Sequence, residues 1–301
     1  MTSRRMRDMP RRTYFAVAIV AAISCASAVR AIDQPAARVT AILGAQAGEI
    51  TPLLNELKDK KEREILGLTF WTGKLGKRQV VITRTGSGKV NAAVAATLAI
   101  ENFHPHELLV TGTAGSLNPE LKPCDVVIAA KTVQHDFVRQ TSSGIERRGA
   151  RNPLTGQRNP TFVEAPVSLV EMAKRAAAAT DFMPISGESK KSSPTAVRVI
   201  VGIVATGDAF VESSEKRKEL RTALQADAVE MEGAAVAQVC YEFKVPCLVI
   251  RGVSDMADES ARADFETYAG TAIANAARLV YNVLQQVAEM KDMPKSVQLT
   301  F

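Results

Sequence analysis

Short apolar runs alternate with amphipathic stretches from residue 37 to about residue 290. Runs rich in Val, Ile and Ala are typical of strands that are covered on both faces. The pattern predicts strands at 37–45, 67–75, 78–85, 107–112, 125–135, 196–206, 227–231 and 247–252. It predicts helices at 49–58, 89–102, 165–180, 214–225, 233–243 and 265–290. This alternation indicates an α/β fold, in which a central mixed β-sheet in a single domain is flanked by helices on both faces.

One long segment breaks the alternation. Residues 139–160 carry several arginines among Ser, Gly, Asn and Pro and show no helical or strand periodicity. A segment of this length without regular structure is either a functional loop or lid, or a solvated loop. Composition does not decide between the two.

The first 31 residues predict an export signal. Six arginines and one aspartate precede or flank an apolar run at 14–23, and small residues follow at 24–28. The run is shorter than the roughly 20 apolar residues that cross a bilayer, and Ala26-Ser27-Ala28 fits a cleavage site, with a second choice at residue 31. We therefore expect a periplasmic or secreted protein with a domain at 37–290 and a C-terminal tail at 291–301, although an uncleaved anchor is the alternative.

Charge and cysteine content narrow the function. The chain has a formal net charge of +6, of which the first 31 residues supply +5, so the remainder is nearly neutral and lacks the basic patch that nucleic-acid binding needs. Cys124, Cys240 and Cys247 match no zinc spacing. Cys240 and Cys247 fit small buried apolar positions better than a disulfide. We predict no metal, no cofactor and no nucleic-acid partner.

Polar residues gather where the apolar runs end. Carboxylates occur there at Glu49, Asp208, Glu230, Glu232 and Asp255, and an arginine occurs at 251. Ligands in open α/β sheets bind at the carboxyl ends of strands. Several carboxylates at one edge favour a ligand with several hydroxyls, or a reaction that develops positive charge. For Glu230 and Glu232 the alternative is a capping role at the helix that starts near residue 233.

Four ordered motifs carry a family resemblance. They are Gly112-Thr113-Ala114-Gly115, Thr206-Gly207-Asp208-Ala209-Phe210, Val229-Glu230-Met231-Glu232 and Arg251-Gly252-Val253-Ser254-Asp255. Together they resemble the purine nucleoside phosphorylase superfamily, and within it most closely the 5′-methylthioadenosine/S-adenosylhomocysteine nucleosidases. The resemblance implies hydrolysis of the N-glycosidic bond of a purine nucleoside with release of adenine.

The resemblance also implies roles for single residues. Asp255 would protonate the purine, with Ser254 positioning its side chain, and Glu49 would activate water. Glu232 would accept the ribose hydroxyls, Met231 would pack under the sugar, and Phe210 would stack on the base while the Val211 backbone pairs with its edge. Arg251 and Thr113 would frame the water site. The remaining substrate-binding positions are Ala114, Gly115, Glu230 and Phe265.

The chemistry accounts for such a set. Breaking the bond leaves an oxocarbenium-like sugar and an electron-rich base, so one group must protonate the base and one anion must face the sugar. Water is favoured over phosphate because Glu49 would repel phosphate, and because Val110 stands where related phosphorylases carry an arginine. Phosphorolysis and a non-catalytic purine-binding relative remain the alternatives.

Departures from the family pattern concern the substrate. The loop after His135-Asp136, which supplies the partner's alkylthio pocket in the nucleosidases, is replaced here by the arginine-rich segment, and Gln46 stands where a methionine is usual. A basic loop would suit a 5′-phosphate, so nucleotides are a further possible substrate class. The resemblance implies a homodimer.

Overall fold

The computed structural model describes residues 38–184 and 196–289. The predicted signal at 1–31 and the predicted tail at 291–301 lie outside these ranges. The strands are β1 (Val39–Gly44), β2 (Lys58–Ile65), β3 (Leu68–Leu75), β4 (Arg78–Arg84), β5 (Glu107–Ser116), β6 (Val126–Gln134), β7 (Val138–Thr141), β8 (Gly144–Arg147), β9 (Phe162–Glu164), β10 (Val199–Thr206), β11 (Ala228–Glu230) and β12 (Cys247–Asp255). The helices are α2 (Ala47–Asn55), α3 (Lys89–Phe103), α4 (Val167–Ala178), α5 (Ser214–Leu224), α6 (Gly233–Phe243) and α7 (Ala261–Glu289).

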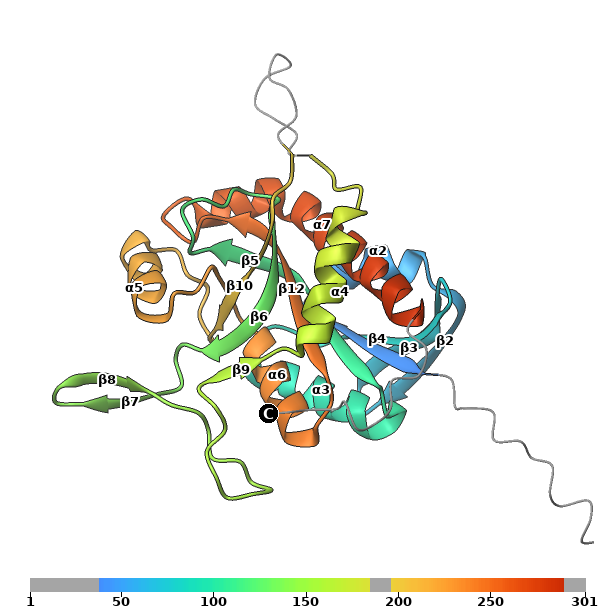
Figure 1. Ribbon diagram of the computed structural model, residues 1–301, viewed down its shortest axis with the longest axis horizontal. Helices are drawn as coiled ribbons and strands as arrows, with labels where there is room; N and C mark the ends of the chain where they lie inside the picture. Colours follow the sequence, from blue (N-terminus) through green and yellow to red (C-terminus); the bar gives the residue numbers. More distant parts are fainter. Residues whose placement is uncertain (1–37, 185–195, 290–301) are drawn as a thin grey trace, which may run out of the picture. The chain divides into compact units, whose positions relative to one another are not determined.

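The main sheet is mixed and partly closed on itself (Figure 1). Its order is β11-β10-β6-β12-β5-β1-β4-β3-β2, with β9 added to β6. Strands β12, β5, β1 and β4 are parallel, whereas β6 runs antiparallel to β12. An additional antiparallel pairing of β11 with β5 joins the first strand in this order to the fifth. The prediction of a mixed central sheet is confirmed.

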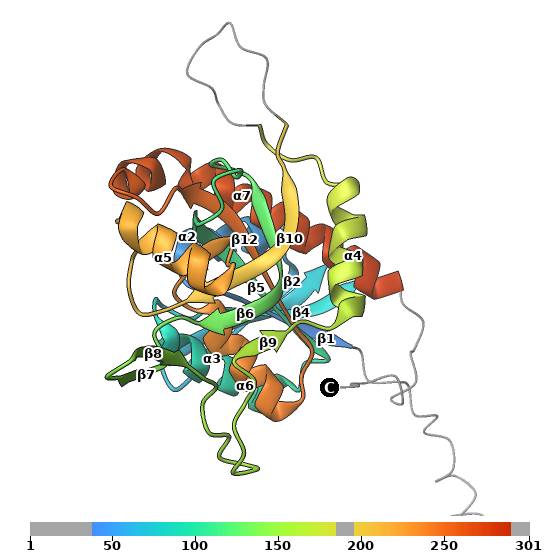
Figure 2. The same ribbon diagram turned by 60° about the vertical axis from the view of Figure 1, so that its left-hand side comes forward.

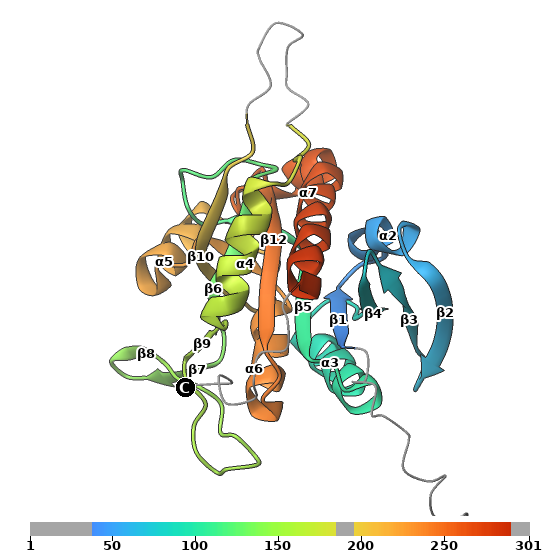
Figure 3. The ribbon, with the colours of Figure 1, turned by 45° about the vertical axis from the view of Figure 1, so that its right-hand side comes forward.

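Helices cover both faces of the sheet (Figures 2 and 3). On one face α3 and α6 pack small side chains, including Ala95, Ala99 and Val236, against β1, β5 and β12. On the other face α2, α4 and α7 pack larger aliphatic side chains against the same strands. Because both faces are covered, the central strands contain almost no exposed position, which explains their continuous apolar runs.

Two regions differ from the sequence prediction. No strand was predicted between the helix expected to end at residue 58 and the strand expected from residue 67, but residues 58–65 form β2, an edge strand whose sequence KDKKEREI is exposed along almost its whole length. The arginine-rich segment contains the hairpin β7–β8 and a bridge between Arg151 and Arg158, so it is not wholly irregular. The hairpin projects from the rest of the domain (Figures 1 and 3).

The cysteines and the helices complete the description. Cys124, Cys240 and Cys247 are buried and free, as small apolar residues would be. Within the described ranges no helix combines the length and apolar character that crossing a membrane requires.

Candidate active site

A cavity of about 370 Å³ opens where β1, β5, β11 and β12 end. This volume lies in the range of small-molecule sites. The predicted residues on its wall are Glu49, Thr113, Ala114, Gly115, Phe210, Glu230, Met231, Glu232, Ser254, Asp255 and Phe265. Gln46, Ser87, Arg262 and Glu266 also line it. Residues from distant parts of the sequence, between positions 45 and 266, therefore meet in one space.

Glu49 is held by four hydrogen bonds from the ends of two strands. Its Oε2 accepts the Ala45 and Gln46 backbone N–H groups at 2.7 and 3.0 Å. Its Oε1 accepts the Thr113 N–H at 2.9 Å and the Thr113 hydroxyl at 3.3 Å. The side chain is 4% exposed. Both carboxylate oxygens of Glu49 are therefore used as hydrogen-bond acceptors.

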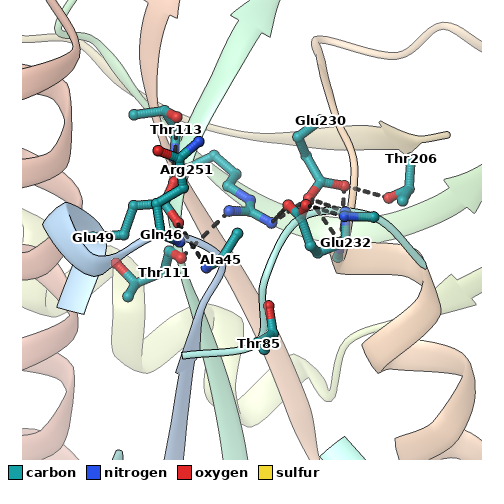
Figure 4. A network of polar contacts seen from close by, with 12 residues as sticks. Ala45, Gln46, Glu49, Thr85, Thr111, Thr113, Thr206, Glu230, Glu232 and Arg251 are labelled. Carbon is teal, nitrogen blue, oxygen red and sulfur yellow. Dashed lines mark hydrogen bonds and ion pairs between the residues drawn. The ribbon is translucent and has the colours of Figure 1, made fainter. Parts of the chain in front are cut away.

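Arg251 lies beneath the cavity, between Glu49 on one side and Glu230 and Glu232 on the other (Figure 4). Its Nη2 contacts Glu230 and lies 3.3 Å from Glu232 Oε2, while its Nη1 donates to the Thr111 carbonyl at 3.3 Å. Burial alone would lower the pKa of Arg251, but the three carboxylates raise it above its usual value. Its Nε has no hydrogen-bond partner within residues 38–184 and 196–289. The guanidinium is a fixed cation at the floor of the site.

The two glutamates of the β11–α6 junction have different roles in the fold. Glu230 accepts the backbone N–H groups of Glu232 and Gly233 at the start of α6, and it also contacts Thr206 and Arg251. Because Thr206 and Arg251 belong to strands β10 and β12, Glu230 attaches the start of α6 to the sheet. Strand β11 ends at Glu230, so the two side chains do not share a strand face.

The carboxylate of Glu232 accepts fewer hydrogen bonds from the protein than that of Glu230. One oxygen accepts the Gly88 N–H at 2.9 Å, and the other faces Arg251 at 3.3 Å. Burial, together with the carboxylates of Glu230 and Glu49, raises the pKa of Glu232 to about 7, although Arg251 and the Gly88 N–H lower it. Glu232 is thus the carboxylate of this pair that can accept a ligand hydroxyl.

Asp255 is the last residue of β12 and is 2% exposed. Its Oδ1 accepts the Ala257 N–H at 2.9 Å, and its Oδ2 lies 2.7 Å from Ser254 Oγ. Burial raises the pKa of the Asp255 carboxyl above its ordinary value, although both hydrogen bonds lower it. Ser254 Oγ is also 3.3 Å from the Ala114 carbonyl. The hydroxyl can therefore donate to ionised Asp255, or accept from protonated Asp255 and donate to Ala114.

Two glycines of the β5 end leave room for these charged groups. A Cβ at position 112 would lie 2.2 Å from Arg251 Nη1 and 2.4 Å from Glu49 Oε1, and Gly112 has a φ of +152°. A Cβ at position 115 would lie 2.6 Å from Asp255 Oδ1. The predicted glycine turn thus permits close approach of backbone to the buried side chains.

Two aromatic rings form the outer wall. Phe210 and Phe265 meet edge to face with centroids 6.2 Å apart. Phe210 is 49% exposed, which leaves its face open to a planar ligand. The Val211 side chain is buried in a separate apolar cluster with Leu117 and Leu220, so any contact of residue 211 with a ligand would involve its backbone.

The structure leaves some sequence candidates outside the cavity. Asp208 does not line it, and none of the arginines of 139–160 does. Arg139 pairs with Glu146 and Arg147 with Glu219, so those two guanidinium groups are engaged within the hairpin or with α5. Among the described residues, no three His, Cys, Asp or Glu side chains are placed to hold a metal ion.

Sequence reasoning missed the loop before α3. Ser87 lines the cavity and the Gly88 N–H contacts Glu232, although neither residue was among the candidates chosen from the sequence. The only available signal was a turn after an apolar strand, which many proteins share.

Comparison with known proteins identifies the family of this chain. Residues 39–285 match the model of the phosphorylase superfamily. A 5′-methylthioadenosine/S-adenosylhomocysteine nucleosidase of Staphylococcus epidermidis is 35% identical over 229 residues, 75% of this chain and 90% of the relative. An aminodeoxyfutalosine nucleosidase of Campylobacter jejuni is 34% identical over 250 residues, 83% of this chain and 97% of the relative.

A solved structure extends the agreement to the fold. The 5′-methylthioadenosine/S-adenosylhomocysteine nucleosidase of Neisseria meningitidis, in complex with methylthio-immucillin-A, is 34% identical and has a TM-score of 0.70. The match covers 83% of this chain and 99% of that protein. The chain belongs to the phosphorylase superfamily.

Proposed function

We propose that this enzyme hydrolyses the N-glycosidic bond of 5′-methylthioadenosine or S-adenosylhomocysteine and releases adenine. The observation that carries the proposal is that Glu49 and Asp255 line one cavity in contrasting surroundings. Glu49 accepts four hydrogen bonds, whereas burial raises the pKa of Asp255. Two carboxyl groups with such different surroundings divide into a base and an acid.

Asp255 delivers a proton to the departing purine. The proton moves from the carboxyl to N7 as the C1′–N9 bond breaks, so the base leaves without accumulating negative charge. The Ser254 hydroxyl can then turn from the Ala114 carbonyl to the newly ionised Asp255 oxygen. Both charge states of Asp255 thereby keep a partner, which supports its use as a general acid.

Glu49 and Glu232 act on the sugar side. Glu49 accepts a proton from water as that water attacks the anomeric carbon, and its charge stabilises the oxocarbenium-like transition state. Glu232 accepts the ribose hydroxyls and Met231 packs beneath the ring. Phe210 stacks on the base. Arg251 holds Glu232 and lowers the cost of gathering several carboxylates in one site.

Water is favoured over phosphate by the charge at the nucleophile position. The Thr113 N–H and hydroxyl are already used by Glu49, and Arg251 is paired with Glu230 and Glu232. A phosphate there would face Glu49 with no free cation beside it, which costs several kcal/mol in a site of low dielectric. Phosphorolysis lacks this support.

The test is chromatographic detection of free adenine from each nucleoside, with and without phosphate. We expect adenine release without phosphate, and a loss of about 10²–10⁴-fold in kcat for Asp255→Asn. Appearance of a pentose 1-phosphate would show phosphorolysis instead. Tight binding of a nucleoside with no turnover would point to a binding protein.

We infer further that the protein is a homodimer. Apolar side chains are exposed on α3 and in or beside the hairpin, including Val90 (74%), Val94 (49%), Phe137 (40%) and Ile145 (52%). Helix α3 follows directly after Ser87, which lines the cavity. A second copy that covered these residues would bury apolar surface and narrow the cavity mouth. Sedimentation of the purified protein tests this.

We also propose that the protein is exported. The basic start, the apolar run at 14–23 and the Ala26-Ser27-Ala28 site support this. The intact mass of protein recovered from the periplasm or the medium tests the proposal. A mass that begins after residue 28 or 31 is expected, whereas an uncleaved chain in the membrane fraction would contradict it.

A further inference from the structure

Three charged side chains outside the cavity lie together where three chain segments meet. They are Lys89 at the start of α3, Asp136 after β6 and Asp208 after β10. Lys89 Nζ lies 2.6 Å from Asp136 Oδ1 and 3.8 Å from Asp208 Oδ2. No role in the proposed reaction has been assigned to any of them.

Backbone hydrogen bonds tie these side chains to the loops that carry them. The Asp208 N–H donates to Asp136 Oδ2 at 2.9 Å, which holds the loop that leads to Phe210. The Lys89 N–H donates to Asp208 Oδ1 at 2.8 Å, which holds the first residue of α3. The neighbouring Gly88 N–H donates to Glu232. Two consecutive N–H groups of one turn thus hold Asp208 on one side and Glu232 on the other.

We propose that Asp208 is a positioning residue, which with Lys89 and Asp136 keeps the turn at residues 86–89 on Glu232 and holds the Phe210 loop at the same time. The inference rests on the proposed function, because it assigns Asp208 a part in binding ribose and base. Asp208 acts through Gly88 and through its own loop, because its side chain does not line the cavity.

The exposure of two of these side chains indicates that the arrangement does not serve the packing of the core. The Asp208 side chain is half exposed and the Asp136 side chain is 31% exposed, so the core does not depend on them. Such partly exposed pairs add little to stability. These side chains instead hold the turn at residues 86–89 next to the Phe210 loop, although the two segments are more than 100 residues apart in the sequence.

The charge of Glu232 is the quantity that this arrangement controls. The groups that face Glu232 are Arg251 from β12, Glu230 from β11, Glu49 from α2 and the Gly88 N–H. The Gly88 N–H lowers the pKa of Glu232 against burial and the two carboxylates. Asp136 faces the Lys89 ammonium and the Asp208 N–H, and the adjacent His135 has a pKa that burial lowers. If the turn moves away, Glu232 loses a donor and becomes protonated at a higher pH.

The experiment compares the pH profiles of kcat/KM for 5′-methylthioadenosine in Asp208→Ala, Asp208→Asn and the wild type. Asparagine keeps an oxygen for the Lys89 N–H, whereas alanine does not. We expect Asp208→Ala to lower kcat/KM about tenfold and to move the acidic limb up by about 0.5–1 pH unit, as the loss of one hydrogen bond would. Asp208→Asn should keep the wild-type limb.

Glu212 supplies the matched control, because it is an exposed carboxylate in the same loop. Glu212→Gln should change neither the rate nor the limb. Asp136→Asn, which weakens the second anchor, should shift the limb in the same direction as Asp208→Ala but by less. An unchanged limb in folded Asp208→Ala, or an equal shift in Asp208→Asn, would overturn the proposal.

A wild type that releases no adenine would contradict the proposed function and not this inference. The limb is then measured as the pH dependence of affinity for methylthio-immucillin-A by calorimetry, with the same variants and the same expected shifts.

Discussion

Two buried charge clusters lie at opposite ends of the central parallel strands, and they are balanced differently. At the amino end, Arg78 contacts Glu107 and donates to the Thr40 hydroxyl, which itself contacts Glu107. At the carboxyl end, Arg251 faces three carboxylates, and no described residue accepts a hydrogen bond from its Nε. One cluster is neutral and complete, whereas the other has an excess of negative charge.

This difference predicts which cluster affects stability and which affects the reaction. A paired and hydrogen-bonded cluster can be buried at modest net cost, and removal of one member leaves a costly lone charge. A cluster with excess negative charge is stabilised only when something positive, or a hydroxyl, enters it. We therefore expect changes at the carboxyl end to affect rate most, and changes at the amino end to affect stability most.

The largest expected effect is on the rate. Glu49→Gln removes the negative charge that faces the sugar and the base that activates water, so kcat should fall about 10²–10⁴-fold. The variant should remain folded, because an amide oxygen can still accept from Thr113. Steady-state adenine release measures the rate and circular dichroism the fold. A loss of less than tenfold would remove Glu49 from the mechanism.

The next effect is on stability at the opposite end of the strands. Arg78→Met leaves Glu107 buried without its cation and should lower the free energy of unfolding by about 3–5 kcal/mol. Arg78→Met combined with Glu107→Leu should recover much of this loss. Urea denaturation measures both. The folded variants should keep the wild-type kcat, and a fall in kcat would show that the two ends are coupled.

A smaller effect with a defined sign concerns Glu232. Its pKa is raised to about 7, so its contribution to stability is present at low pH and is lost as pH rises through 7. Glu232→Gln removes this dependence. Relative to wild type, its free energy of unfolding should increase between pH 5 and pH 8 by about 1–3 kcal/mol, although activity should fall. If the difference in free energy of unfolding between the variant and the wild type does not change with pH, Glu232 does not titrate between pH 5 and pH 8.

The sequence anticipated the fold best where burial is complete. Strand β12 and helix α6 have apolar patterns typical of a buried strand and a buried helix, and α6 was predicted at its observed bounds. Strand β2 was missed because its residues are charged and exposed, so neither face carries an apolar signal. Its partner β3 creates the strand, and that pairing is not encoded in the composition of 58–65.

The site was anticipated in its residue types but not in its connections. Strand ends predicted where Glu49 and Asp255 would stand. The sequence did not show that Glu230 is used by the start of α6 while Glu232 stays available, because β11 ends between them. It also could not link Gly88 to Glu232 across 144 residues. Such contacts follow from the closed part of the sheet, which local patterns do not specify.

The smallest expected effect concerns the cavity mouth, where Arg262 is the one lining cation among the described residues and lies beside Glu266. The two side chains are 82% and 70% exposed, so their mutual attraction is weak and both can meet a charged ligand group. The 5′ sulfur of S-adenosylhomocysteine bears an amino acid chain, whereas the 5′ sulfur of methylthioadenosine bears a methyl group. Arg262→Ala should lower kcat/KM about two- to fivefold for the first substrate only.

Arg139→Ala is the control for that prediction, since Arg139 lies on the hairpin and does not line the cavity of its own chain. It should leave both substrates unchanged. If Arg139→Ala reduces the rate and Arg262→Ala does not, the hairpin of a second subunit supplies the cation at the mouth. The negative excess at the carboxyl end would then be balanced across the dimer, whereas the amino end is balanced within one chain.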